Sequence, residues 1–461
     1  MKIKEVPSPW IARWGSRLDA GPYLSGAVDA RMMMESPRFR SGKLASVTSA
    51  IYHAGREGRR WVSDEKYGVP FLSSSDILKA DLSDLPLLSK KQVEANPGFV
   101  VRKGWTLITR SGTIGRMAYV RPDMDGMACS EHAMRVVPDE GVIAPGYLFA
   151  FLRSRFGVPM VIGGTYGSIV QSIEPEHVSA LPVPRLGAKF EAEIHELVEA
   201  AATLRANGAQ AIRRVVLSLP EALGLRELTA RGVTAYGTSS ISFSGLRGRL
   251  DAPYHSAAAM EVEAQLANSR VQALPISEVL AAHFKPPMFK RLWVEDPRYG
   301  RQFVSGNDAY RFEAEEIRYV STKTPGFDAF ILKRGWVIFQ AAGQIYGLFG
   351  KPLLVRGWLE DIFCADDVYR LVPRNEADGA YLFAFFKTPH GEVLLKRQAC
   401  GNSIPRVWDP HMRDVQVPWP AESVRNHVAK PILQAHADIE TARLKETEAI
   451  RLIEEAIEGA A

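Results

Sequence analysis

The sequence predicts an α+β protein with two similar globular domains, separated by long helices that pair as an antiparallel coiled coil. Three observations lead to this prediction. The chain of 461 residues repeats itself at about half its length, and each repeat is rich in short strand-like runs that glycine and proline interrupt. Each repeat then ends in a long stretch with apolar residues at three- and four-residue steps, which is the spacing of an amphipathic helix.

The internal repeat can be followed over most of the chain, with a shift of 231 to 235 residues between the two copies. The matched segments include Gly104-Trp105 and Gly335-Trp336, YLFAF at 147–151 and at 381–385, Cys129 and Cys364, Arg135 and Arg370, and Val183-Pro184 and Val417-Pro418. A shift that stays within a few residues over so many matches indicates a tandem duplication.

Short strands and helices are expected in order within the first copy. A hairpin is predicted over 101–120, because Gly112 and Gly115 permit a tight reversal before a second strand that begins near Arg116. A helix is predicted over 145–155, and a short helical turn over 174–177 precedes the closing strand. The second copy repeats this order.

A long helix is predicted after each globular part, because apolar residues recur there as a heptad-like seam. The two seams consist of Phe190, Ile194, Leu197, Ala201, Leu204, Ala211, Val215 and Leu219, and of Val424, Val428, Ile432, Ala435, Ile439, Ala442, Ala449, Ile453 and Ala456. Gly208 is expected to bend the first helix, and Pro431 is expected to start or kink the second. The alternative to mutual pairing is that each helix folds back onto its own domain.

These features divide the chain into four parts. They are a first globular domain at 1–185, a first spacer helix at 186–222, a second globular domain at 223–419 and a second spacer helix at 420–461.

Composition indicates a globular protein and permits nucleic acid as a partner. The chain is 46% hydrophobic and 24% charged, with a formal net charge of +5. The odd count of three cysteines, without metal-type spacing, indicates reduced thiols in a cytoplasm, with Cys129 and Cys364 in the core. The N-terminus lacks an apolar signal segment and no run reaches membrane-spanning length, so no membrane association is expected.

Catalytic motifs are missing from the sequence. The segment Asn96-Pro97-Gly98-Phe99 approaches an adenine-methyltransferase motif but lacks its second proline, and no phosphate loop or S-adenosylmethionine loop occurs. His132 and His177 stand alone, so structural roles are expected for both. The sequence predicts no catalytic residue, no cofactor and no metal site.

The ordered motifs resemble the DNA-specificity subunit of type I restriction-modification enzymes. The resemblance rests on the hairpin with a glycine turn, the YLFAF helix, a Gly-[Ser/Asn]-x-Ile loop, a strand ending in Val-Pro and a long helix, all present twice. It implies two target recognition domains that each read half of a split DNA site, and helices that set the spacing and dock other subunits. The implied partners are double-stranded DNA, two methyltransferase subunits and restriction/translocase subunits.

Two groups of residues are candidates for DNA contacts, because backbone contacts require cations and base readout requires Arg, Lys, Asn, Gln, Ser or Thr. The basic clusters around the repeated tryptophans are Arg56, Arg59, Arg60 and Lys66, and Lys285, Lys290, Arg291 and Arg298. The residues at or after the glycine turns are Arg110, Arg116, Gln344 and Lys351, followed by the loop residues Thr165, Tyr166, Ser168, Gln171, Asn402, Ser403 and Arg406.

Two functions from different classes remain open at this point. The first is a non-catalytic DNA-reading subunit that directs separate methylation and cleavage subunits. The second is a tandem-domain DNA-binding or interaction module of another defence system, or a self-contained DNA-modifying enzyme. The purified chain distinguishes them, because the first function predicts sequence-dependent DNA binding without methylation or cleavage.

Overall fold

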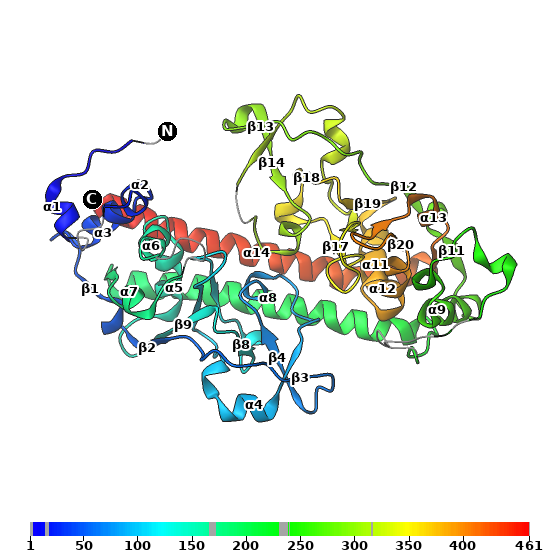
Figure 1. The fold of residues 1–461 in the computed structure, drawn as a ribbon, viewed down its shortest axis with the longest axis horizontal. Coiled ribbons are helices and arrows are strands. Elements are labelled where there is room, and N and C mark those ends of the chain that lie inside the picture. Colours follow the sequence, from blue (N-terminus) through cyan, green and yellow to red (C-terminus); the bar gives the residue numbers. More distant parts are fainter. Residues whose placement is uncertain are drawn as a thin grey trace. The chain divides into compact units, whose positions relative to one another are not determined.

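The computed structural model describes residues 3–13, 18–165, 172–229, 238, 240–314 and 317–460. The chain divides into two compact units, which we call unit 1 (Met1–Asn207 with Thr441–Ala461) and unit 2 (Gly208–Glu440). Both unit boundaries fall inside the long helices, so each unit contains one globular part and a portion of both helices (Figure 1).

Unit 1 contains two four-stranded sheets in the orders β2-β9-β6-β7 and β3-β5-β4-β8, and a two-stranded sheet of β1 and β10. Neighbouring strands are antiparallel, except that β4 and β8 are parallel. The strands are β1 Ser41–Lys43, β2 Thr48–Tyr52, β3 Trp61–Val62, β4 Gly68–Leu72, β5 Leu87–Ser89, β6 Thr106–Thr109, β7 Met117–Tyr119, β8 Ala128–Cys129, β9 Ala133–Pro138 and β10 Pro182–Pro184. The shorter helices are α1 Ser8–Arg13, α2 Gly21–Leu24, α3 Ala27–Met34, α4 Lys90–Ala95, α5 Pro145–Arg153, α6 Gly157–Ile162 and α7 Pro175–Ser179.

Unit 2 repeats this sheet order as β12-β19-β16-β17, β13-β15-β14-β18 and β11-β22, again with one parallel pair, β14 and β18, and it adds a β20-β21 pair. The strands are β11 Ala273–Pro275, β12 Leu280–Phe284, β13 Trp293–Val294, β14 Gly300–Val304, β15 Tyr319–Ser321, β16 Val337–Gln340, β17 Pro352–Leu354, β18 Phe363–Cys364, β19 Val368–Pro373, β20 Ala399–Cys400, β21 Arg406–Val407 and β22 Gln416–Pro418. The helices are α9 Ala257–Ala267, α10 Ile276–Val279, α11 Glu376–Phe386, α12 Pro389–Lys396 and α13 Asp409–Met412. The matching order confirms the duplication and the α+β fold class.

The repeated sequence motifs meet in the core of each unit. YLFAF lies on α5 in unit 1 and on α11 in unit 2, where all five residues are buried in both copies. The Tyr147 hydroxyl donates to the Pro184 carbonyl oxygen at 2.6 Å, and the Tyr381 hydroxyl donates to Pro418 at the same distance. This hydrogen bond ties the helix to the closing Val-Pro strand. Cys129 and Cys364 are fully buried, as predicted.

The glycine turn forms the predicted hairpin in unit 1. Strand β7 begins at Met117, next to the expected Arg116, and pairs antiparallel with β6. Gly112 and Gly115 both have φ of 78°, a left-handed conformation that favours glycine. In unit 2 the link from β16 to β17 is longer, because β17 begins only at Pro352.

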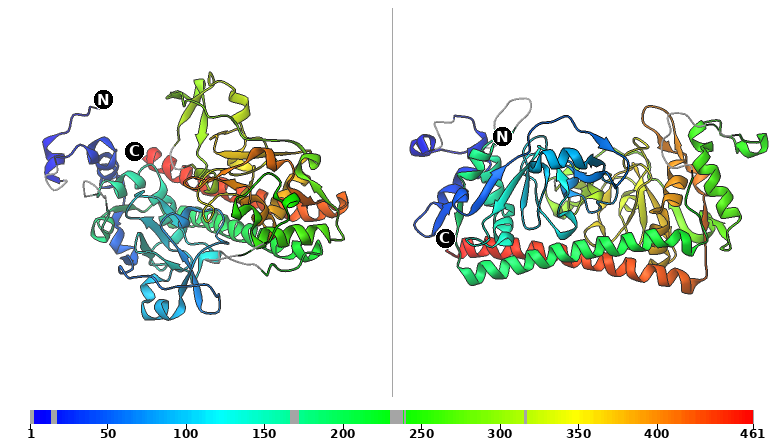
Figure 2. Two further views of the ribbon diagram at one scale, coloured as in Figure 1. Left: turned by 45° about the vertical axis from the view of Figure 1, so that its right-hand side comes forward. Right: turned by 90° about the horizontal axis from the view of Figure 1, so that it is seen from below.

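Two long helices, α8 (Ala188–Ala222) and α14 (Glu422–Ala460), pair side by side (Figures 1 and 2). They run antiparallel, because Arg205 meets Glu446 while Gly208, further along α8, meets Ile439, which lies earlier on α14. The prediction of paired antiparallel helices is therefore confirmed. Each helix also buries apolar residues in the core of a globular part, so pairing and folding back occur together.

The buried stripe of each helix partly differs from the predicted seam. On α8 the seam residues Ile194, Ala201 and Leu219 are buried, whereas Leu197 and Leu204 are only half-buried. On α14 most of the predicted stripe is buried, but Val424 is exposed. The buried positions differ from the predicted seam because each helix packs on its partner helix and on a globular part at once.

Helix α8 continues through Gly208, and the bend expected there stays a prediction. A Cβ at this position would lie 2.9 Å from Ile439 and 3.0 Å from the Ala435 carbonyl oxygen. Glycine is therefore needed for the close approach of α14. Pro431 does not start the second helix either, because α14 begins at Glu422 and continues through the proline.

Stability of unit 2 is expected to fall between pH 6.5 and about 4 because of His436 on α14. Burial, helped by Arg356 and Lys387, lowers the pKa of His436 from 6.5 to about 4, and its Nε2 has no hydrogen-bond partner within the described part of the chain. Above pH 6.5 the residue is neutral in both states. As the pH falls, the unfolded state gains a proton first, so the free energy of unfolding drops by about 3 kcal/mol across this window.

The measurement is urea unfolding at pH 7.5 and at pH 4.5 for the parent and for His436→Leu. The variant should lose only the part of the pH dependence that this imidazole supplies. An identical pH dependence in both proteins would contradict the assigned role of His436.

Candidate nucleic-acid interface

The two predicted basic clusters lie in equivalent loops of the two units. Basic loop 1 (residues 56–67) surrounds β3, and basic loop 2 (residues 285–299) surrounds β13. Both strands lie at the end of a four-stranded sheet, so each loop belongs to a sheet edge.

An arginine–aromatic cluster supports each basic loop. In unit 1 the Trp61 ring meets the Phe71 ring edge-on at 5.2 Å, and the Arg59 guanidinium lies 4.8 Å from the Phe71 centroid. Arg59 also forms an ion pair with Glu131 at 3.0 Å. In unit 2 the corresponding residues repeat the arrangement, with Trp293 and Phe303 at 5.2 Å and Arg291 and Phe303 at 5.3 Å. Such pairs fix ring and cation orientation.

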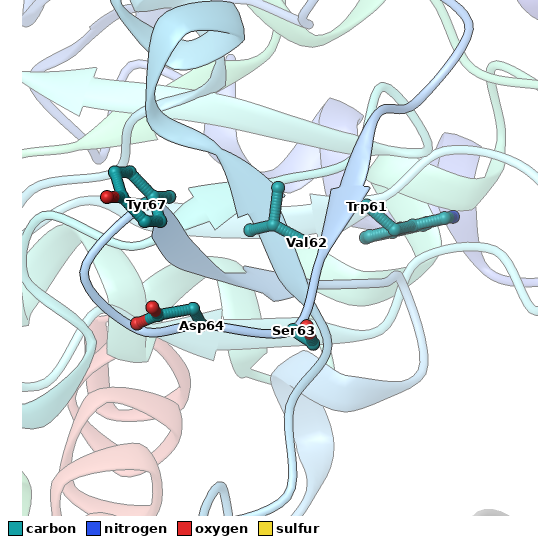
Figure 3. A pocket seen from close by; sticks show the side chains of 5 residues that line it. All are labelled: Trp61, Val62, Ser63, Asp64 and Tyr67. Carbon is teal, nitrogen blue, oxygen red and sulfur yellow. The ribbon is translucent and has the colours of Figure 1, made fainter. Parts of the chain in front are cut away.

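An open hollow lies on basic loop 1 and is lined by Trp61, Val62, Ser63, Asp64 and Tyr67 (Figure 3). The two aromatic side chains flank it, with exposed fractions of 49% for Trp61 and 57% for Tyr67. In basic loop 2, Trp293 and Tyr299 are similarly exposed, at 43% and 63%. Each unit therefore presents two exposed aromatic rings among cations, which is a composition suited to a nucleic-acid surface.

The predicted cations of the basic loops differ in their availability. Arg56, Arg60, Lys66 and Lys290 are exposed, whereas Lys285 is half-buried. Arg298 is exposed but forms an ion pair with Asp296 at 2.6 Å, which lowers the pKa of Asp296. Phosphate contacts are thus best supplied by Arg56, Arg60, Lys66 and Lys290, while Arg59 and the exposed Arg291 lie against aromatic rings.

Arg110, predicted to contact DNA, serves the glycine turn of unit 1. Its guanidinium pairs with Glu174 at 2.5 Å and donates from Nε to the Ile173 carbonyl oxygen at 3.1 Å. It is therefore held by the segment that precedes α7. Arg116 and Thr165 are both half-buried. The predicted residues Tyr166, Ser168 and Gln171 lie outside the described residues.

A polar chain beside this turn was not predicted from the sequence. The Ser111 hydroxyl and His132 Nδ1 are 2.6 Å apart, and His132 Nε2 lies 3.4 Å from Glu131, the partner of Arg59. The chain joins the turn to basic loop 1. The sequence did not reveal this chain, because Ser111 and Arg59 come from loops other than the one that contains Glu131 and His132.

A fully buried arginine holds the loop that carries this polar chain. Arg135 on β9 donates to the carbonyl oxygens of Ser130 at 2.8 Å and Phe99 at 3.1 Å, and also to Ala133 and Cys129. In unit 2, Arg370 on β19 is equally buried and donates to the carbonyl oxygens of Ala365, Val368 and Cys364. Burial lowers the pKa of Arg370. The repeat match at these positions could have revealed the pair.

The turn of unit 2 has different chemistry. Gln344 donates to the Ser403 carbonyl oxygen at 3.2 Å, which connects the turn to the β20-β21 loop. The predicted residues Asn402 and Ser403 in that loop and Arg406 on β21 are exposed. Lys351 is half-buried, and its carbonyl oxygen accepts from Tyr310 at 2.6 Å. The structure therefore brings Gln344 and Ser403 together, whereas the contact given for Lys351 is the one to Tyr310.

The described residues contain neither a candidate metal site nor a membrane-spanning helix. No group of three or more His, Cys, Asp and Glu residues that could hold a metal ion occurs in the described ranges. Among the helices described, none is long and apolar enough to span a membrane.

Comparisons with known proteins give matches among solved structures alone. No family model and no curated protein matches the chain. A type I restriction-modification system S subunit from M. genitalium is similar over 92% of this chain and 97% of its own, at 9% identity and a TM-score of 0.38. The HsdS subunit from Thermoanaerobacter tengcongensis is similar over 92% and 96%, at 13% identity and a TM-score of 0.28. A chain from work on complex assembly and conformational transition of the type I R-M system is similar over 92% and 98%, at 16% identity and a TM-score of 0.29.

Proposed function

We propose that this chain is the non-catalytic DNA-specificity subunit of a type I restriction-modification enzyme and that it reads a split DNA target. The observation that carries the proposal is one fold present twice, with the same sheet order but different polar loops. A shared framework with divergent loops is the arrangement expected of two modules that read different half-sites. The order of the sequence motifs supports the same family.

Basic loops 1 and 2 are proposed to bind the DNA backbone. Arg56, Arg60, Lys66 and Lys290 are exposed on these loops, beside aromatic rings that could lie against sugars or bases. Cations of this kind neutralise phosphates without reading the sequence.

The glycine-turn loops are proposed to read bases. Unit 2 offers Asn402, Ser403 and Arg406 as exposed side chains. The candidates of unit 1 are Thr165, Tyr166, Ser168 and Gln171. Asn and Gln suit adenine, and Arg suits guanine. Arg110, Arg116, Gln344 and Lys351 are proposed to shape these loops, because Arg110 and Gln344 already bond to neighbouring loop segments.

The paired helices are proposed to separate the half-sites and to dock two methyltransferase subunits, to which restriction/translocase subunits add. We keep the boundaries 1–185, 186–222, 223–419 and 420–461 as functional domains, although the compact units cut through both helices. Action on cellular DNA would place the complex in the cytoplasm.

A binding selection on random double-stranded DNA tests the split-site reading. The parent should select two short motifs separated by a fixed number of base pairs. Replacing Asn402 and Arg406 by alanine should relax one motif, and replacing Ser168 and Gln171 should relax the other. Removal of a single base-reading side chain should cost about 1–3 kcal/mol of discrimination.

Each pair of substitutions is the control for the other, because each removes two polar side chains from one copy of the repeat. Selection of a single continuous motif by the parent would refute the proposal. So would a change of both motifs after substitution in one unit. The same preparations should neither methylate nor cleave DNA on their own.

A further inference from the structure

Glu446 of α14 is a buried carboxylate in the helix pair of unit 1. It forms an ion pair with Arg205 of α8, and it lies 3.4 Å from Arg153 of α5. The side chains of Glu446 and Arg205 are only 9% and 10% exposed. Burial alone would raise the pKa of Glu446, but Arg205 and Arg153 lower it, so the carboxylate stays charged.

The repeat shows what occupies the corresponding places in unit 2. Helix α8 begins at Ala188 and α14 at Glu422, which are 234 residues apart, as are the two YLFAF motifs. By this shift Arg205 corresponds to Ile439, and Glu446 corresponds to Ile212. Ile212 is buried in the apolar core of unit 2, and Ile439 packs against that core. The same place in the helix pair is thus ionic in one unit and apolar in the other.

This asymmetry has a consequence for how two related helices choose partners. Because α8 and α14 descend from one repeat, either could pair with its own counterpart in a second copy of the chain. In the same register, α8 paired with α8 would set Arg205 against Ile212. Helix α14 paired with α14 would set Glu446 against Ile439. Each arrangement separates Arg205 from Glu446 and buries one of the two charges against an isoleucine, which is strongly unfavourable. Pairing of two α14 helices would also put Ala442 where Gly208 allows the close approach, so those helices would lie slightly further apart.

We infer that the buried Arg205–Glu446 pair selects the pairing of α8 with α14 and rejects self-pairing of either helix between two copies of this chain. A single buried polar contact is known to set register and partner choice in coiled coils. It does so here by making the wrong pairs costly. The inference concerns helix pairing alone and stands independently of the proposed function.

The test uses the full chain with a cysteine reporter of α14 self-pairing. The midpoint between residues 439 and 446 falls between Ala442 and Arg443, so the two copies of Ala442 would lie close together if two α14 helices paired. Ala442→Cys is combined with Cys400→Ser, which removes the exposed native thiol. The protein is unfolded in urea, refolded at several concentrations and oxidised, and disulfide-linked dimer is measured by non-reducing electrophoresis.

Replacing the ion pair by Arg205→Ile and Glu446→Ile makes this place apolar in both units. The variant should fold, yet yield on the order of tenfold more cross-linked dimer than the reporter protein, with the yield rising with concentration. Two copies could also exchange their α14 helices, so that α14 of one copy pairs with α8 of the other. This exchange would not bring the two cysteines at position 442 together and would give no cross-link. The assay therefore reports self-pairing.

The control removes an exposed ion pair of the same helix, through Glu448→Gln and Arg451→Gln. It should leave the dimer yield unchanged. Equal dimer yields from the double-isoleucine variant and the reporter protein would overturn the inference. If the double-isoleucine variant does not fold, Arg205→Met with Glu446→Met is judged by the same criterion, because flexible Met side chains fit irregular sites.

Discussion

Replacing Arg135 by methionine is expected to lower the free energy of unfolding by about 3–5 kcal/mol. The guanidinium is fully buried and donates to four backbone carbonyl oxygens in unit 1. Methionine fills much of the space but leaves those carbonyl groups without a donor, and each buried unsatisfied group is costly. Urea unfolding followed by circular dichroism provides the measurement.

The Arg135 substitution is expected to affect DNA binding as well as stability. Arg135 holds the loop at residues 130–132, which contains Glu131 and His132. Loss of Arg135 should release this loop and so also weaken any DNA contact made by basic loop 1. Arg102→Met is the matched control, because Arg102 is 58% exposed and its replacement should change stability by less than about 0.5 kcal/mol. Comparable stability of the Arg135 and Arg102 variants would contradict the role assigned to Arg135.

The second large effect concerns the salt dependence of DNA binding. A variant with Arg56, Arg60 and Lys290 replaced by alanine should leave up to three phosphates without a neutralising cation. The slope of log affinity against log salt concentration should then flatten by roughly 0.9 for each of these phosphates. Sequence preference should be nearly unchanged, because backbone contacts do not read bases. Fluorescence anisotropy at several salt concentrations measures the slope.

A triple variant of the long helices controls for net charge. Arg213, Arg214 and Lys430 are exposed on α8 and α14, and replacing them by alanine removes the same number of charges of the same kinds. This variant should keep the parent slope. If both triple variants flatten the slope equally, the basic loops are not the phosphate-binding surface.

Local features of the fold could be predicted well from the sequence. The glycine turn, the YLFAF helix and the two long helices depend on short-range preferences and periodicity, which the sequence contains directly. The duplication strengthened these predictions, because each element occurs twice in the sequence. Bounds were close, as in α5 at Pro145–Arg153 against the expected 145–155.

The predicted effects of Gly208 and Pro431 on the long helices were partly wrong: Pro431 does not start α14, whereas a bend at Gly208 or a kink at Pro431 stays a prediction. Gly208 and Pro431 are helix breakers by intrinsic preference, yet both lie within continuous helices. At Gly208 the close contact with α14 compensates for the backbone entropy that glycine costs. Such compensation comes from another segment, so intrinsic preference could not reveal it.

The candidate site was predicted as residue types rather than as an arrangement. The cations around the repeated tryptophans were identified from residue type alone. Side-chain contacts were needed to separate those that can reach a ligand from those that support other side chains. Arg59 and Arg291 support aromatic rings, and Arg110 pairs with Glu174, which is distant in sequence. Ion pairs between distant segments leave no periodic signal in the chain.

The sequence by itself determined that the protein is a duplication of one α+β unit followed by a long amphipathic helix, because repeats and periodicity are properties of the chain. Only the tertiary structure decided which charges are available and which are buried. Arg135, Arg205 and Glu446 look like ordinary charged residues in the sequence, yet they are enclosed by segments far away along the chain. Burial depends on those long-range contacts, and burial decides whether a charge contacts solvent and ligands or fixes the fold.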